Sequence, residues 1–490
     1  MNNIFDKLKN YSDSDYYAFH MPGHKRNLDL MDGTSPYRID ITEIDGFDDL
    51  HHAEGILRDA QERAARVYHA DETHFLVNGS TVGILSAILG TTEKGDSILV
   101  ARNCHKSVYH AIYLNELDPV YLYPKFDTEL GLSTEIDAED VQKALEEHPK
   151  IRAVMIVSPT YDGVVSDIEK IAEIVHAKGC PLIVDEAHGA HFGFDPYFPK
   201  SANIYGADLV INSLHKTLPA LTQTALLHVN GDMVKRRKVK QYLDMLQTSS
   251  PSYILMASID ACIGMLEETL ETHSDARSDY KYKNKNIFSE YANRIEALRK
   301  DLKRLKYLKI IQTDNTDRYD RSKFVISVKH APMSSHELYE ILLHRYHLQM
   351  EMLAGTYVLA MTTVGDTQEG LDRLRDALLE IDKEIDTKQG RPAAIETDLP
   401  LSGRQPALEK VWTIAEAVNR RDKIQKRSFE DSIGCISVEY AYLYPPGSPL
   451  IVPGERITKE AVEVLHWYQE HDFSIEGLQS EDGIEVWIDG

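Results

Sequence analysis

Cysteine is scarce in this sequence, and its four copies, Cys104, Cys180, Cys262 and Cys435, form neither a CxxC pair nor a dense pattern. This scarcity excludes a disulfide-stapled secreted scaffold and favours a reducing compartment. No apolar run approaches the roughly 20 residues that a helix needs to cross a bilayer, and residues 1–10 lack the apolar stretch of a secretory signal. We therefore expect a cytoplasmic protein without a membrane partner.

Basic side chains are in deficit, with 54 Lys and Arg against 78 Asp and Glu and a formal net charge of -24. An acidic protein repels the phosphates of nucleic acids and attracts small cations. The hydrophobic share of 42% and the charged share of 27% are typical of a globular protein. With 490 residues, no internal repeat and no low-complexity tract, the chain is expected to form two or three domains.

Residues 70–230 alternate short apolar runs with helical patterns, which is typical of βαβ units and a mostly parallel sheet. The sequence therefore predicts an α/β fold for this part. Strands are predicted at residues 75–77, 97–101, 120–123, 153–157, 182–184 and 209–212, and helices at residues 82–89, 138–147 and 168–177.

A different pattern begins near residue 260. Leucines and isoleucines recur at three and four through residues 260–310, which predicts one long amphipathic helix. A smaller α+β domain is expected after it, and the prolines and glycines of residues 387–405 indicate a linker. Its strands are predicted at 324–328 and 357–361 and its last helix at 367–385, and the whole chain divides into residues 1–55, 56–260, 261–390 and 395–490.

Polar motifs follow three of the predicted strands. Residues 78–81 (NGST) open a helix, where free backbone N–H groups and the helix dipole bind a phosphate, although Ser and Thr are also ordinary helix caps. Asp185 follows the strand at 182–184, at the edge where open α/β sheets bind ligands. It could instead cap the next turn or form a metal site with His188 and His191, which is the poorer choice because the HExxH helical setting is missing.

Lys216 follows the strand at 209–212 by a tight turn, one helix-sized crossover after Asp185. A lysine at a buried strand end is costly to charge, which favours the neutral amine that forms a Schiff base. The anion-binding turn, the carboxylate and the amine together predict a site for pyridoxal 5'-phosphate. In such a site Asp185 keeps the pyridine nitrogen protonated, so that the ring accepts electrons from the α-carbon of the substrate.

Further motifs carry a resemblance to a known family. They are HMPGHK at 20–25, DITE at 40–43 with DDL at 48–50, VNGST at 77–81, RNCHKS at 102–107, SPTYDG at 158–163, DEAH at 185–188, SLHK at 213–216, QTSSPSY at 247–253, YPPGSP at 444–449 and PGE at 453–455. With these motifs in this order, the sequence resembles the Orn/Lys/Arg decarboxylases of the aspartate-aminotransferase fold, in the shorter form of Gram-positive bacteria. The resemblance covers nearly the whole chain.

The resemblance implies a fold type I enzyme whose large domain has a mostly parallel sheet and is followed by smaller α+β domains. It implies that Lys216 carries the cofactor, that Asp185 pairs with the pyridine nitrogen and that His105, otherwise readable as a surface or helix-start histidine, stacks on the ring. The remaining implied contacts are the phosphate with Ser80, Thr81, Ser213 and His215, the underside of the ring with Ala187, and the substrate with His188. It also implies a homodimer with active sites between the subunits, in which Thr248 and Ser249 reach the phosphate of the partner.

The expected reaction is the decarboxylation of a basic L-amino acid. Arginine, giving agmatine and carbon dioxide for polyamine biosynthesis, is the leading substrate, with lysine or ornithine next. Residues 357–363 lack the arginine with which transaminating relatives hold the substrate carboxylate, and an apolar, uncharged setting favours its loss. The proton returned to the α-carbon would come from Lys216, His188 or His215. The side chain of the substrate needs an anionic partner, for which the candidates are Asp162, Glu439 and Glu455, each of which could equally be a surface carboxylate.

Two other kinds of protein remain open at this point. One is a pyridoxal-phosphate aminotransferase or β-eliminating lyase of the same fold. The other is a catalytically silent, decarboxylase-like binding or regulatory protein, against which the complete set of His105, Asp185 and Lys216 argues. Because the receiver-like domain of the longer, acid-induced members is missing from this sequence, we expect a dimer or a dimer of dimers rather than a large ring.

Overall fold

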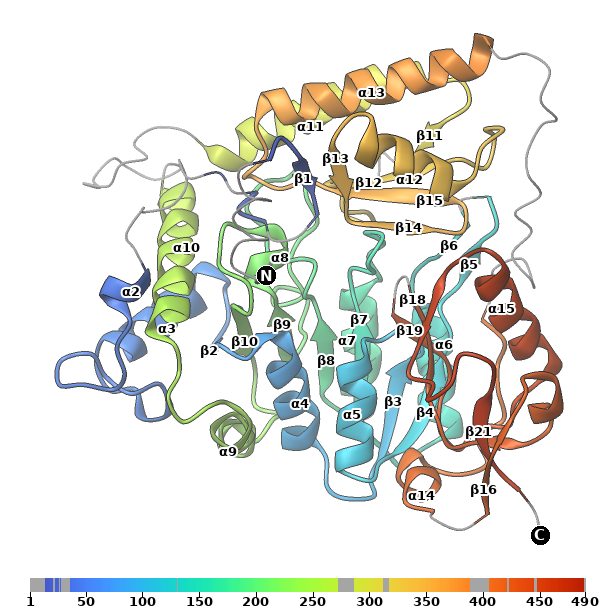
Figure 1. Ribbon diagram of the computed structural model, residues 1–490. Coiled ribbons are helices and arrows are strands. Elements are labelled where there is room, and N and C mark those ends of the chain that lie inside the picture. Colours follow the sequence, from blue (N-terminus) through green and yellow to red (C-terminus); the bar gives the residue numbers. More distant parts are fainter. Residues whose placement is uncertain are drawn as a thin grey trace.

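The computed structural model describes residues 14–20, 23–25, 27, 36–129, 131–271, 286–311, 317–387, 405–420, 423–444 and 447–488. Its largest element is a seven-stranded sheet with the order β2-β10-β9-β8-β7-β3-β4. Helices cover both faces of this sheet (Figure 1), as the alternating pattern predicts. The strands are β2 (Glu72–Leu76), β3 (Ser97–Ala101), β4 (Asp118–Leu122), β7 (Ile151–Val157), β8 (Leu182–Asp185), β9 (Leu209–Asn212) and β10 (Ala225–Val229).

The predicted strands are confirmed, with β3 and β9 at the predicted bounds, and the sheet is parallel except at β10. The sequence analysis did not predict β10, which runs antiparallel to both β2 and β9. His228 interrupts its apolar run and weakens the strand pattern. The structure accommodates this buried imidazole by a 2.7 Å contact between its Nδ1 and the hydroxyl of Thr73 on β2.

Helices of this part follow the strands in turn. The predicted bounds of α6 and α7 are confirmed at both ends. Each helix starts where it does because an aspartate, Asp137 or Asp167, caps its first turn by accepting a backbone N–H. The predicted helix at 82–89 is longer, since α4 begins at Gly79. The bounds are α3 (Ile56–Val67), α4 (Gly79–Thr91), α5 (Lys106–Leu114), α6 (Ala138–Glu147), α7 (Ile168–Ala177), α8 (Leu214–Thr217), α9 (Arg236–Leu246) and α10 (Tyr253–Glu271).

The prediction of one long helix through 260–310 is wrong. Helix α10 ends at Glu271, residues 272–285 lie outside the described residues, and α11 begins only at Ile287. Asn286 has extended backbone angles and its side chain accepts the N–H of Ser289, so it starts a new helix. Leucine periodicity continues on both sides of the break, and periodicity alone does not register a cap.

A second lobe contains a four-stranded sheet with the order β11-β12-β15-β14. The predicted strands at 324–328 and 357–361 and the helix at 367–385 are present as β12, β15 and α13. The N-terminal strand β1 (Tyr17–Phe19) pairs in parallel with β13, which brings the start of the chain to this lobe. The bounds are α11 (Ile287–Leu302), β11 (Lys309–Ile310), β12 (Lys323–Ser327), α12 (Ser335–His344), β13 (Leu348–Met350), β14 (Met352–Ala354), β15 (Tyr357–Met361) and α13 (Gln368–Thr387).

The C-terminal part forms two three-stranded sheets, β16-β21-β17 and β19-β18-β20, around α15. Residues 388–404 of the predicted linker lie outside the described residues. The bounds are α14 (Ile414–Val418), β16 (Ile424–Arg427), η4 (Glu430–Ser432), β17 (Ile436–Ser437), β18 (Ala441–Tyr444), β19 (Ser448–Ile451), α15 (Lys459–Glu470), β20 (Ser474–Glu476) and β21 (Ile484–Trp487). The described residues also form the short elements α2 (Pro36–Ile39), η2 (Leu50–His52), β5 (Phe126–Asp127) and β6 (Leu132–Ser133).

A buried ion pair joins the C-terminal part to the large sheet. The Nη2 of Arg102, directly after β3, lies 2.9 Å from Oε2 of Glu455, and each side chain is only 1% exposed. The same guanidinium donates to the carbonyl of Leu450 and to the hydroxyl of Tyr109. Since a buried charge is costly without a partner, this pair couples the position of the C-terminal part to the strand edge.

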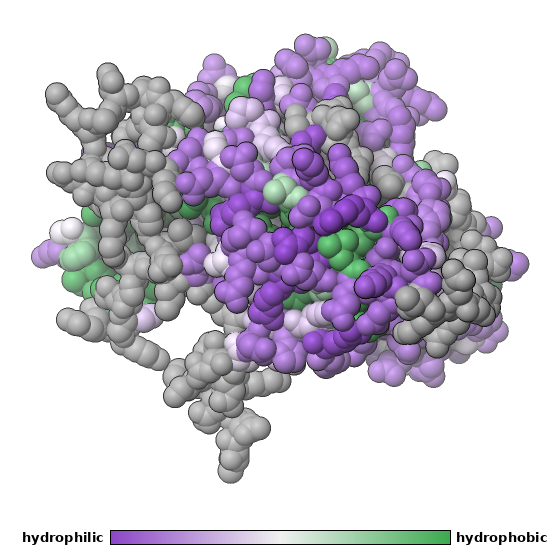
Figure 2. Space-filling model, turned by 90° about the horizontal axis from the view of Figure 1, so that it is seen from above, coloured by the Kyte–Doolittle hydropathy of each residue, from purple (hydrophilic) through white to green (hydrophobic). Residues whose placement is uncertain are grey.

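The visible surface is mostly hydrophilic, in keeping with the charged composition, and apolar side chains gather on the side where α2 and α10 lie (Figure 2). In and after α2 in the sequence, the large exposed apolar residues include Ile39, Ile44, Phe47 and Ile56. Among the helices that the structure describes, none is both long and apolar enough to span a membrane.

Candidate active site

The three predicted motifs meet at one edge of the large sheet. Strands β8 and β9 are parallel neighbours, with Asp185 at the end of β8 opposite Ile211 of β9, so the turn after β9 lies beside Asp185. Strand β2 ends close by, because β10 pairs with both β2 and β9. The carboxyl ends of parallel strands are where open α/β sheets bind ligands. The structure therefore brings the turn at 78–81, Asp185 and Lys216 together, as the sequence predicts.

Lys216 lies on the one-turn helix α8, and its Nζ is 3.1 Å from Nε2 of His188. Burial lowers the pKa of Lys216, and the nearby carboxylates of Asp185 and Glu351 oppose this effect. The pKa of His188 is well below its usual value because the ring is buried, with Lys216 adding to the shift. The pair thus consists of a neutral imidazole and an amine that gives up its proton more readily than an exposed lysine.

Asp185 is 3% exposed, and its Oδ1 accepts the backbone N–H of Ala187 at 3.1 Å. Burial raises the pKa of this carboxyl, whereas Lys216 lowers it. Among the described residues, no cation lies within ion-pairing distance of Asp185. A buried carboxylate in this position therefore favours a cationic group beside it.

The turn at residues 78–81 has the geometry of an anion site. Gly79 adopts φ +74 directly at the start of α4, where the N–H groups of a first helical turn have no intrahelical acceptors. The side chain of Asn78 does not cap this helix but accepts the N–H of Thr248 at 3.4 Å. Ser80 is half-buried and Thr81 is exposed. Across from them, the hydroxyl of Ser213 is buried and has no hydrogen-bond partner among the described residues.

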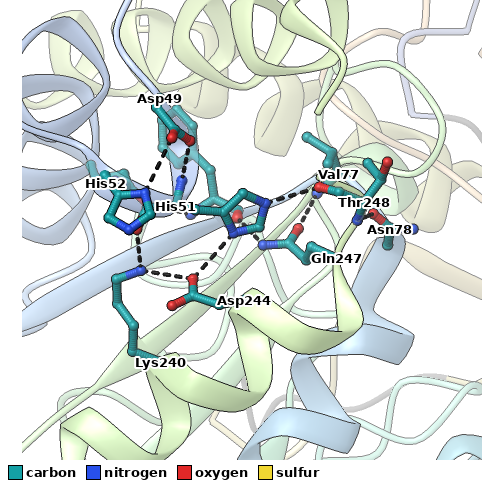
Figure 3. A network of polar contacts seen from close by, with 11 residues as sticks. Asp49, His51, His52, Val77, Asn78, Lys240, Asp244, Gln247 and Thr248 are labelled. Carbon is teal, nitrogen blue, oxygen red and sulfur yellow. Dashed lines mark hydrogen bonds and ion pairs between the residues drawn. The ribbon is translucent and has the colours of Figure 1, made fainter. Parts of the chain in front are cut away.

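A polar network holds this turn in place (Figure 3). The side-chain amide of Gln247 accepts the N–H of Val77 at 2.9 Å, just before the turn. The ring of His51 links α9 to the residues that follow it. Its Nδ1 lies 3.1 Å from Asp244 on α9, and its Nε2 lies 2.9 Å from the carbonyl of Thr248. The start of α4 is therefore fixed before any ligand binds, which lowers the entropic cost of binding.

His105 is the N-cap of α5, and its Nδ1 accepts the N–H of Ser107 at 3.2 Å. His105 is exposed as a residue, but desolvation by the surrounding protein lowers the pKa of its ring to about 4, and the Lys216 amine contributes to this shift. The ring is therefore neutral at pH 7 and lies within electrostatic range of Lys216. His215 is half-buried, with Nδ1 2.9 Å from the carbonyl of Thr224.

The acidic candidates for binding a substrate side chain are separated by the structure. Glu455 pairs with Arg102, and Glu439 accepts the backbone N–H groups of Gln479 and Glu485, so both carboxylates serve the C-terminal part. Asp162 instead lies in the lobe interface, where it accepts the hydroxyl of Tyr357 and where burial raises its pKa to about 6.

The alternative metal site is not assembled. His191 is turned towards the second lobe, with Nε2 3.1 Å from Oδ1 of Asp320, and so does not join Asp185 and His188. In the part of the chain that the structure describes, no group of three or more His, Cys, Asp or Glu residues could hold a metal ion.

Two charged residues beside Lys216 were missed by the sequence analysis. Lys323, at the start of β12, is fully buried, and its Nζ lies 3.4 Å from Nδ1 of His188. Glu351 acts on the charges of Lys216, Lys323 and Lys25 and accepts the hydroxyl of Tyr161. In the sequence, Lys323 stands out only as a lysine at the start of an otherwise apolar strand. That position does not indicate which distant residue the side chain contacts.

The expectation of an uncharged setting around residues 357–363 is wrong. Lys323 is the strand partner of Met361, and the ammonium of Lys25 donates to the carbonyls of Met361 and His20 at 2.8 Å each. These cations reach the segment from β12 and from the N-terminal part of the chain. The segment itself has no arginine, but its neighbours supply positive charge.

Comparison with known proteins gives consistent matches along the chain. Residues 2–333 match the model of the Orn/Lys/Arg decarboxylase major domain, and residues 404–486 match the model of the Orn/Lys/Arg decarboxylase C-terminal domain. The protein named "Uncharacterized protein YaaO" from Bacillus subtilis (strain 168) is 36% identical over 470 residues, which cover 94% of this chain and 93% of that one. Two proteins named "Arginine decarboxylase" are each 31% identical, one from Bacillus subtilis (94% of this chain and 92% of the other) and one from Bacillus anthracis (97% and 94%).

Solved structures share the fold at lower identity. The constitutive lysine decarboxylase of E. coli is 21% identical with a TM-score of 0.73, covering 88% of this chain and 73% of that one. The Francisella novicida lysine decarboxylase LdcF is 18% identical with a TM-score of 0.77, covering 98% and 80%. An aminotransferase from Bacillus subtilis, ureidoglycine-glyoxylate aminotransferase, is 12% identical with a TM-score of 0.58 over 79% of this chain and 97% of that one. The chain therefore has the predicted type I fold, with an additional C-terminal α+β part.

Proposed function

The chain belongs to the Orn/Lys/Arg decarboxylase family, and from this premise we propose that it decarboxylates L-arginine to agmatine and carbon dioxide with pyridoxal 5'-phosphate as cofactor. The choice of arginine as substrate rests on four relatives that are named arginine decarboxylase and match over almost their full length. In the sequence comparison, the relatives named lysine decarboxylase match about half of this chain at 26 to 27% identity, and the lysine decarboxylase structures that match more of it are at most 21% identical. We further propose that the product amine supplies polyamine biosynthesis.

The residues at the strand edge fit the proposed cofactor. The turn at 78–81 and the unpartnered hydroxyl of Ser213 offer donors to a phosphate, and Asp185 offers a buried carboxylate to a pyridinium nitrogen. Lys216 offers an amine of lowered pKa to the aldehyde. The other proposed contacts are Ser80, Thr81 and His215 at the phosphate, His105 on one ring face and Ala187 on the other. When bound, the cofactor supplies an electron sink for the bond that breaks at the α-carbon of the substrate.

The residues around Lys216 have separate proposed tasks. The neutral ring of His188 lies within hydrogen-bonding distance of the Lys216 amine, so these two groups can exchange a proton beside the α-carbon. His215 is less suited to this step, because its Nδ1 is tied to the carbonyl of Thr224 and it faces the proposed phosphate site. We propose that Lys216 and His188 deliver the proton that replaces the carboxylate.

Two carboxylates are proposed to bind the cationic side chain of the substrate. Glu351 and Asp162 both lie in the second lobe or at its border, within electrostatic range of the lysines around the site. Each already accepts a tyrosine hydroxyl, from Tyr161 and Tyr357 respectively, which fixes its orientation. A guanidinium prefers such a fixed, planar acceptor, whereas an ammonium is satisfied by any compact cluster.

A substrate panel tests the proposed reaction. With the full-length protein loaded with pyridoxal phosphate, carbon dioxide and amine should be released in equal amounts from arginine, and faster than from lysine or ornithine. The control is D-arginine, because the mirror arrangement points a different bond at the same residues. Formation of a keto acid without gas would instead support the aminotransferase, and binding of arginine without any product would support the silent regulatory protein.

We propose that the protein acts as a homodimer or a dimer of dimers in the cytoplasm. The exposed apolar residues Ile39, Ile44, Phe47 and Ile56 support a self-association surface, and the four free cysteines support a reducing compartment. The proposed contact of Thr248 and Ser249 with the partner's phosphate fits their exposed position next to the turn at 78–81. The division of the chain at 1–55, 56–260, 261–390 and 395–490 also stands as a proposal. The seven-stranded, the four-stranded and both three-stranded sheets each lie within one of these ranges, which supports it, whereas β1 pairs with β13 across two of them.

Sedimentation measures the proposed assembly. The wild-type mass should be a multiple of the 55.6 kDa chain, and Phe47→Asp should shift it towards a single chain because it places a charge in an apolar contact. Met233→Asp, at an exposed apolar residue of another segment, is the matched control and should leave the mass unchanged. A wild-type protein that sediments as a single chain at all concentrations would contradict the proposal.

A further inference from the structure

Lys323 is a fully buried lysine without a carboxylate partner. Its relative exposure is 0%, and its Nζ contacts Nδ1 of His188 at 3.4 Å. Among the described residues, no carboxylate lies within ion-pairing distance of this ammonium. A buried cation without such a partner is costly, so its presence needs a reason beyond stability.

The ring of His188 stands between two lysine amines. Its Nδ1 faces Lys323 at 3.4 Å, and its Nε2 faces Lys216 at 3.1 Å. A neutral imidazole has one N–H and one lone pair, whereas an ammonium can only donate. The two lysines therefore cannot both be ammonium ions that donate to this ring. One of them must be a neutral amine that accepts the ring N–H.

The carboxylates around Lys323 accept hydrogen bonds from other residues, so the ring of His188 is the acceptor for the Lys323 ammonium. Asp320 is held by His191 and Ser322, Glu351 accepts Tyr161, and Asp162 accepts Tyr357. The ammonium of Lys25, which repels that of Lys323, is bound by two carbonyls. Arg299 and Tyr319 contact only the backbone carbonyl of Lys323. In the part of the chain that the structure describes, the polar atom within hydrogen-bonding distance of the Lys323 ammonium is Nδ1 of His188.

We propose that Lys323 is a positioning residue whose ammonium donates to Nδ1 of His188, fixes the tautomer with hydrogen on Nε2, and so keeps the amine of Lys216 neutral. This inference rests on the proposed role of Lys216 as the residue that carries the cofactor. Proton transfer among Lys323, His188 and Lys216 breaks and forms only N–H bonds. A proton that Lys216 takes from Nε2 is replaced at Nδ1 by one from Lys323, so a positive charge moves from Lys323 to Lys216 and the ring ends neutral.

Burial and several charged neighbours act on the ammonium of Lys323. Burial lowers the pKa of Lys323 to about 8, with Asp320 and Glu351 opposing the shift and Lys216 and Lys25 adding to it. Below pH 8 Lys323 is therefore mainly an ammonium ion, and by Coulomb's law its charge disfavours a second positive charge on Lys216 beyond the ring. Removing that charge should raise the pKa of Lys216 and reduce its neutral fraction at pH 7.

The experiment follows the attachment of pyridoxal phosphate to the cofactor-free, full-length protein as a function of pH. The readout is the growth of a visible absorbance band that borohydride removes, so substrate turnover is not needed. In Lys323→Met the pH profile of the attachment rate should move up by about one pH unit, which makes attachment about tenfold slower at pH 7. Lys323→Gln, whose amide can still donate to Nδ1, should show a smaller shift.

A double-mutant cycle tests whether the effect passes through the ring. In a His188→Gln background, adding Lys323→Met should cause a smaller shift, because only the through-space effect of the charge remains. An unchanged profile in Lys323→Met alone, or an equal shift in both backgrounds, overturns the proposal. A raised KM for arginine with an unchanged attachment profile also overturns it, since Lys323 would then contact the substrate.

Folding and the proposed function are controlled separately. Exchanging a buried, unpaired cation for an apolar side chain of similar volume is neutral or stabilising, so the thermal midpoint of Lys323→Met should not fall. If that variant does not fold, the Lys323→Gln variant decides the question, and an unchanged profile in it overturns the proposal. If the wild-type protein itself forms no borohydride-sensitive band, the proposed role of Lys216 fails, which is a different result from an unchanged profile.

Discussion

The Lys216→Ala variant is expected to lose at least about a thousandfold in the rate of carbon dioxide release from arginine. The amine of Lys216 has a lowered pKa, contacts His188 and is close to Asp185. Alanine removes both the attachment point of the cofactor and the proposed proton carrier. Trapping of released carbon dioxide at saturating arginine and pyridoxal phosphate measures the loss.

Two comparisons make this result specific. Lys216→Arg should fail as completely as the alanine variant, because a guanidinium stays protonated and cannot attack an aldehyde. Lys143→Ala, on the exposed surface of α6, should leave the rate unchanged, since it removes only a solvent-exposed contact with Glu147. A Lys216→Ala variant that folds and still releases carbon dioxide at the wild-type rate would contradict the proposed function.

The Asp185→Asn variant is expected to lower kcat by about 10²–10³. Asparagine keeps the size of the side chain and can still accept the N–H of Ala187. It cannot hold a positive charge on the facing ring nitrogen, because it is neutral in a site that is 3% exposed. The expected loss is therefore in the chemical step rather than in binding, and steady-state rates over a range of arginine concentrations separate kcat from KM.

Glu186 provides the matched control for Asp185. It is the next residue in the chain, it is equally buried, and its carboxylate points into a different set of donors, from Ser201, Ala202 and Asn212. Burial raises its pKa to about 7, so the neutral Glu186→Gln variant resembles a form that the protein already populates. We expect Glu186→Gln to lose some stability but to keep kcat. Equal losses in both variants would indicate that Asp185 acts only on folding.

The sequence was sufficient for the parts of the site that depend on local pattern. Apolar runs and helical patterns placed β8, β9, α6 and α7, and parallel strands necessarily end at the same edge of a sheet. Asp185 and Lys216 therefore meet wherever the sheet forms. The resemblance of the motifs added His105, which local pattern alone presents as the helix cap that it also is.

Only the tertiary structure decided the contacts between the lobes. Lys323 meets His188 across 135 positions, and Arg102 meets Glu455 across 353. These contacts withdrew Glu455 from the candidates for substrate binding and replaced the expected uncharged wall by one with buried lysines. The reason is physical: helix and strand periods repeat within a few residues and are legible in the sequence. The partner of a buried charge is set instead by how separately formed sheets pack, and the spacing of residues along the chain does not contain that information.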